Sequence, residues 1–126
     1  MSFLSQRAEE FLEQARFAYE RGGYYDLVMF NVEQFMQLKL KSLLYNLIGD
    51  YPRTHRLTQL FMELMKILND KCHLNDFYTR NREVILLLEF AYIASHYMPP
   101  RFNRDDAEKA LNIANEFNEV VKCLLS

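Results

Sequence analysis

The chain has 126 residues, of which half are hydrophobic and a quarter are charged, with only 3 Gly and 3 Pro. This composition predicts one globular, soluble domain over residues 1–126 and excludes a largely disordered chain. The formal net charge of -2 excludes a general attraction to nucleic acid or to an anionic membrane, so an anion site would require a local cluster of cations.

The cysteines and the N-terminus predict a protein of a reducing, cytoplasmic compartment. Cys72 and Cys123 lie far apart and form no disulfide framework, so we expect both thiols to be free. The opening "MSFLSQRAEEF" carries charges where a secretory signal is apolar. The longest apolar run, Val84 to Leu88, is far shorter than the roughly 20 residues that span a bilayer.

Apolar residues recur at helical spacing, and no segment shows the alternation of a strand. The first predicted helix carries a stripe from Leu4 to Ala18 and stops at Gly22 and Gly23, because glycine accepts the left-handed backbone that ends helices. The second runs from about residue 24 to 48 and ends before Gly49.

Three more helices follow. The third is expected from residue 53 or 54 to 68 and the fourth, after the polar connector "NDKCHLND", from about 76 to 96. Beyond "MPPRF", Asn103 with Asp106 resembles an N-terminal cap for a fifth helix that reaches about Leu124. Short connections then predict an all-α, antiparallel bundle of five helices.

The second and fourth helices carry more apolar residues than one stripe holds. We expect the fourth, with Ile85 to Leu88 around its circumference, to be the central helix. The surplus residues of the second, Phe30, Met36 and Leu40, allow two readings. Another copy of the chain covers them in a homodimer, or they pack centrally within one chain.

Up-and-down connectivity would bring the end of the second helix, the start of the third, the end of the fourth and the start of the fifth to one end of the bundle. That end would collect Arg53, His55, Arg56, His96, Tyr97, Arg101 and Arg104, with Arg7 beside them, and the opposite end Arg21, Arg80 and Arg82. Cations and helix N-termini favour anions, so one reading is a phosphate site. The other is a set of solvated or ion-paired helix ends, with Tyr97 and Phe102 folding over the core.

Other site chemistry is not supported by the spacing of residues. Cys72 and His73 have no second pair that would complete a zinc site. A Gly-rich phosphate loop and a G-x-S-x-G turn are both missing from the sequence. We therefore predict neither a metal nor a cofactor.

Three stretches carry a family resemblance. A first helix ends at glycine, an aromatic residue follows, and the next helix has Gln34 with Lys41 seven residues on. "THRLTQLF" supplies Thr54, His55 and Leu57, and "ASHYMPPRFNRDDAEKALNIANEF" follows near the end. In this order and spacing, over roughly residues 8 to 122, they resemble the HEPN family (higher-eukaryote and prokaryote nucleotide-binding domain). The resemblance implies a helical fold, a dimer, nucleotide or RNA binding, and a small nucleotidyltransferase as partner in a toxin–antitoxin-like pair.

The departures from the family pattern concern catalysis. His96 stands where the family commonly has Arg, Met98 where it has Pro, and Gln37 where it has Glu. Ribonuclease members carry an Arg, four to six residues, and then a His, whereas the positions that would precede His96 in this way are Glu89, Phe90 and Ala91. The resemblance therefore argues against the nuclease chemistry known in the superfamily.

Three functional readings follow. The first is a non-catalytic homodimer that binds nucleotide or RNA through Arg53, His55, Arg56, His96, Tyr97 and Arg101. The second is a metal-independent ribonuclease with a rearranged pair, in which His55 or His96 acts as acid or base and Arg53 or Arg101 holds the phosphate. The third is a dimerisation module with an incidental Arg-rich end.

Overall fold

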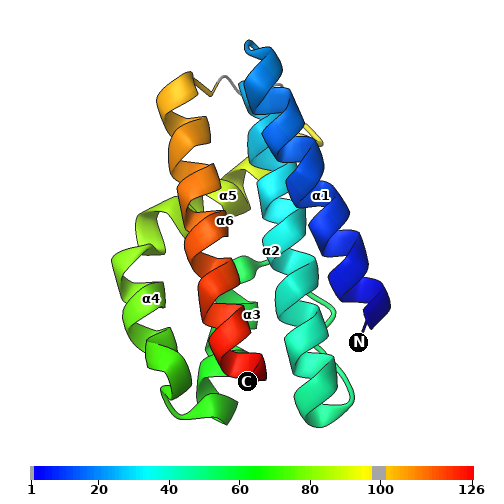
Figure 1. Ribbon diagram of the computed structural model, residues 1–126, viewed down its shortest axis with the longest axis vertical. Coiled ribbons are helices and arrows are strands. Elements are labelled where there is room, and N and C mark those ends of the chain that lie inside the picture. Colours follow the sequence, from blue (N-terminus) through cyan, green and yellow to red (C-terminus); the bar gives the residue numbers. More distant parts are fainter. Residues whose placement is uncertain (1, 98–101) are drawn as a thin grey trace.

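The computed structural model describes residues 2–97 and 102–126, and all of its regular elements there are helical. They are α1 (Ser2–Arg21), α2 (Tyr25–Ile48), α3 (Leu57–Leu68), the 3-10 helix η1 (Lys71–His73), α4 (Leu74–Arg80), α5 (Arg82–Ala94) and α6 (Arg104–Leu125). The three long helices α1, α2 and α6 run along the longest axis of the molecule (Figure 1). The all-α prediction is confirmed, but the count of five helices is not.

Local chemistry sets the ends of the long helices where the sequence predicted them. Gly49 ends α2 in the left-handed conformation, with φ of 77°, and its N–H donates to the carbonyl of Tyr45 at 2.8 Å. Asn103 caps α6: its side chain accepts from the N–H of Asp106 at 2.8 Å, and the Asp106 carboxylate accepts from the N–H of Asn103 at 3.1 Å. These two predictions of helix boundaries are confirmed.

The predicted fourth helix is in fact two helices, α4 and α5, which meet at Asn81. The Asn81 side chain and backbone N–H both donate to the carbonyl of Phe77, at 3.0 and 3.1 Å. A short amide side chain that bonds the backbone in this way competes with continuation of the helix. A single apolar pattern across residues 76–96 concealed the break.

The central helix is α2 rather than the predicted fourth. It contacts α1, α3, α5 and α6, and it contributes more buried residues than any other helix of the described chain. Met36 and Leu40 are fully buried within the chain and Phe30 is half-buried, so central packing accounts for most of the surplus apolar surface of this helix. In contrast, α5 exposes Leu86, Phe90 and Ile93 on its outer side.

Four phenylalanines from four helices form the centre of the core. The ring of Phe117 on α6 lies 5.7 Å from those of Phe61 on α3 and Phe77 on α4, and 6.2 Å from Phe35 on α2. All four side chains are buried. This cluster fixes α3 and α4 against α2 and α6, and so fixes the start of α3 on which the candidate site depends.

Cys72 and Cys123 form a disulfide, which contradicts the prediction of free thiols. Their Cα atoms lie 6.1 Å apart although 51 positions separate them in the sequence. The contact between η1 and the end of α6 creates this proximity, and sequence spacing cannot reveal it.

Candidate functional site

The segment between α2 and α3 positions one wall of the candidate site. It does not begin a helix at residue 53 or 54, as predicted, because the N–H of Arg56 donates to the Thr54 hydroxyl in a local turn at 3.1 Å. The segment instead runs back along α2: the Tyr51 ring lies 5.5 Å from the Lys41 ammonium, and His55 lies against Tyr92, which stacks on Phe30.

This return path corrects the prediction of one common end for the predicted cations. The start of α6 lies instead beside the start of α2, where the N–H of Phe102 donates to Asp26 at 2.8 Å. Arg104 lies over the Tyr19 ring of α1 and pairs with Glu108 at 3.3 Å, while Arg7 pairs with Glu10 at 3.6 Å. Neither arginine lines the hollow that the other predicted residues form.

The last turn of α5 and the residues that directly follow it supply the second wall. The two walls enclose an open hollow of about 570 Å³. We call it the cationic pocket, and it is lined by Arg53, Thr54, His55, Arg56, Tyr92, Ile93, His96 and Tyr97. The structure thus brings together five of the six predicted site residues, and the sixth, Arg101, lies outside the described residues.

Tyr92 organises the aromatic side of the cationic pocket, and the sequence analysis missed it. The imidazoles of His55 and His96 lie 5.3 and 5.1 Å from its ring, and Phe30 stacks on it at 6.2 Å. Its hydroxyl is 3.4 Å from Nδ1 of His55. Tyr92 precedes His96 by one helical turn, so the helical spacing of these two residues was the available indication.

The arginines of the cationic pocket are open to solvent but already have protein neighbours. The Arg53 guanidinium lies 4.6 Å above the Tyr51 ring and 3.7 Å from the Asp50 carboxylate. Arg56 Nε is 3.9 Å from Oε2 of Glu89. Both arginine side chains are mostly exposed, so these pairs are weak and a phosphate can approach both cations.

A buried polar network lies along α2 close to the cationic pocket. Glu33 accepts from Gln34 at 2.7 Å and from Gln37 at 2.8 Å, and Gln37 in turn accepts from Lys41 at 3.0 Å. Burial raises the pKa of Glu33 to about 7, although both glutamines lower it, and burial also lowers the pKa of Lys41. Gln34 and Lys41, noted from the sequence by resemblance, are therefore parts of this network.

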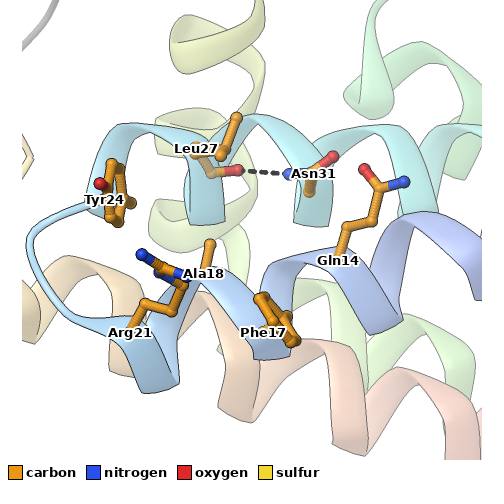
Figure 2. A pocket seen from close by; sticks show the side chains of 7 residues that line it. All are labelled: Gln14, Phe17, Ala18, Arg21, Tyr24, Leu27 and Asn31. Carbon is orange, nitrogen blue, oxygen red and sulfur yellow. Dashed lines mark hydrogen bonds between the residues drawn. The ribbon is translucent and has the colours of Figure 1, made fainter.

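A second hollow, of about 360 Å³, lies between α1 and α2, and we call it the α1–α2 groove. Figure 2 shows its residues around the α1–α2 turn, with the Asn31 side chain donating to the carbonyl of Leu27 at 2.9 Å. Phe17, Tyr24 and Leu27 line it and are each at least half exposed. The α1–α2 groove is more apolar than the cationic pocket.

Two further kinds of site are not supported by the described part of the chain. Within residues 2–97 and 102–126, no three His, Cys, Asp or Glu side chains gather closely enough to hold a metal ion. In the same ranges, no helix has both the length and the apolar character needed to cross a membrane.

Comparison with known proteins gives one family. The family model described as "HEPN domain" matches residues 1–124, nearly the whole chain. Neither a curated protein nor a solved structure matches the chain.

Proposed function

The chain belongs to the HEPN domain family, and on this premise we propose that it is a non-catalytic member that binds a nucleotide or the phosphate backbone of RNA in the cationic pocket. The observation that carries the proposal is the convergence of Arg53 and Arg56 with two histidines and Tyr97 in one open hollow. Because the chain has a formal net charge of -2, its overall charge does not explain why these cationic side chains gather in one place.

Each wall of the cationic pocket has a chemical role in the proposal. The planar guanidinium forks of Arg53 and Arg56 suit phosphate oxygens, and the ring nitrogens of His55 and His96 can donate further hydrogen bonds to them. Tyr97 is 85% exposed, so its ring is open to stack on a base. The proposal extends this binding to Arg101 from the sequence alone.

The absence of catalysis is inferred from residue types. The motif of the ribonuclease members requires an Arg five to seven positions before the His, and residues 89–91, which precede His96, are Glu, Phe and Ala. Glu89 is buried and bonded to Thr58, so a carboxylate occupies part of the region where a phosphate-binding cation would be needed.

One observation favours the alternative of a metal-independent ribonuclease. The imidazoles of His55 and His96 both lie against the Tyr92 ring, so two side chains of the type that often acts as general acid or base share one pocket with two arginines. Single-stranded RNA should nonetheless stay intact without metal. Cleavage that is lost in both His55→Ala and His96→Ala would replace our proposal with this alternative.

We further propose a cytoplasmic homodimer, with a small nucleotidyltransferase as partner, as the family resemblance implies. The apolar α1–α2 groove, with Tyr24 at the start of α2, supports the dimer, because exposed apolar patches commonly mark interfaces. Light scattering at a protein concentration of roughly tens of micromolar, where a dimer of ordinary affinity is populated, should give a dimer for the parent and a monomer for Leu27→Asp. The control Leu86→Asp, on the outer side of α5, should leave the dimer intact.

Titration of ATP and of a single-stranded RNA oligomer by calorimetry tests the binding proposal. Arg53→Ala and Arg56→Ala should each weaken affinity about tenfold, as expected for a charge-assisted bond. Affinity should fall with added salt, because salt screens the contacts between the arginines and phosphate. The matched control Arg7→Ala removes an exposed arginine outside the pocket and should change nothing. A parent that binds neither ligand at low salt would refute the proposal.

A further inference from the structure

We propose that Glu89 is a positioning residue of the cationic pocket, which caps the first turn of α3 and competes with a bound phosphate for Arg56. The inference rests on the proposed function and adds an internal regulator of affinity to it. Glu89 lies on α5, one turn before Tyr92 and Ile93, but both of its interactions reach the opposite wall.

The capping role follows from the start of α3. Arg56 occupies the N-cap position and provides no side-chain cap. Oε1 of Glu89 instead accepts from the Thr58 N–H at 3.1 Å and from the Thr58 hydroxyl at 2.9 Å. Glu89 is only 7% exposed, so these bonds are shielded from water. A carboxylate at a helix N-terminus also complements the helix dipole, so one side chain of α5 fixes the wall that begins α3.

The competing role follows from the second oxygen of the same carboxylate. Oε2 is 3.9 Å from Nε of Arg56, while the Arg56 side chain is 65% exposed and faces the cationic pocket. A phosphate that binds Arg56 must share this guanidinium with a fixed negative charge. The capped geometry therefore favours binding, and the charge that provides the cap opposes it.

The two roles predict different effects for two substitutions of this one residue. Glu89→Gln retains an oxygen that can accept both bonds from Thr58, but it removes the charge near Arg56. Glu89→Ala removes the charge and the cap together. If Glu89 were only structural, Glu89→Gln would have no reason to bind anions more tightly than the parent.

Calorimetric titration with inorganic pyrophosphate at low salt is the test, because this probe reports phosphate binding without a base. We expect Glu89→Gln to bind about two- to fivefold more tightly than the parent, the range for a partly exposed charge pair. We expect Glu89→Ala to bind about fivefold more weakly than Glu89→Gln and to melt several degrees lower, since it leaves the half-buried N–H of Thr58 without its acceptor. The matched control Glu83→Gln, an exposed carboxylate on the same helix, should behave like the parent.

A double variant and the parent separate the possible failures. In the Arg56→Ala background, Glu89→Gln should give no gain, because the competition requires this guanidinium. If the parent binds and Glu89→Gln binds no more tightly, the competing role is wrong and the proposed function stands. If only Glu89→Gln binds, the competing role holds and the native chain lacks the proposed function. If neither binds, both ideas are wrong.

Discussion

Reduction of the Cys72–Cys123 disulfide should lower the stability of the fold substantially. The bridge joins residues separated by 51 positions, and closing a loop of this length removes unfolded-chain entropy equivalent to about 4 kcal/mol at 25 °C. Cys123 is exposed and Cys72 is half-buried, so a reductant can reach the bridge without unfolding the core. The four-phenylalanine cluster does not include either cysteine, so the reduced chain should still fold.

Urea denaturation with and without a thiol reductant measures this effect. With a urea dependence of about 2 kcal/mol per molar, the midpoint should fall by about 2 M on reduction. Cys72→Ser and Cys123→Ser should match the reduced parent and should not respond to reductant. A loss below about 1 kcal/mol in the parent would refute the reasoning, because it would mean that the loop closure does not restrict the unfolded chain as assumed. In the proposed cytoplasmic location the reduced form would be expected, so both forms should be assayed for binding.

Three further substitutions test the core, a cap and the buried carboxylate. Phe117→Ala should destabilise the fold by about 3 to 5 kcal/mol in urea denaturation, because it leaves a cavity among the buried aromatic rings. Asn103→Ala should cost about 1 kcal/mol by the same assay, through loss of the α6 cap, and an unchanged midpoint would contradict that role. Because the folded pKa of Glu33 is raised from 4.5 to about 7, its contribution to stability is fully present below pH 4.5 and falls by about 3 kcal/mol as pH rises to 7. Denaturation at several pH values should therefore show a smaller difference between parent and Glu33→Ala near pH 7 than near pH 4.5.

Local interactions made much of the helical architecture predictable from the sequence. The spacing of apolar residues identified the long helices, and Gly49 and the Asn103–Asp106 pair marked their ends correctly. These features depend on residues within one or two turns of each other, so neighbouring positions in the sequence contain the information. The same local chemistry misled at Asn81, where one side-chain bond to Phe77 divides an unbroken apolar pattern.

The candidate site was predictable in its residues but not in the path that gathers them. The sequence indicated that Arg53, His55 and Arg56 meet His96 and Tyr97, and the structure places all five in one pocket. It also suggested that Arg104 would join them, whereas Arg104 lies over Tyr19 of α1 and the residues before α6 lie beside the start of α2. The path of residues 49–56 along α2 decides which cations meet in the pocket. The sequence does not show this path, because the direction of a connecting segment depends on what it packs against.

The sequence by itself determined the extents of the long helices α1, α2 and α6, although not the start of α3 or the break between α4 and α5. Only the tertiary structure decided that α2 is central, that Cys72 meets Cys123, and that Glu89 reaches across to Thr58 and Arg56. The disulfide and the Glu89 contacts join residues more than thirty positions apart. The central place of α2 depends on how deeply whole helices are buried. Such contacts arise when several helices pack at once and bury their apolar faces together, and periodicity within a single helix does not contain that information.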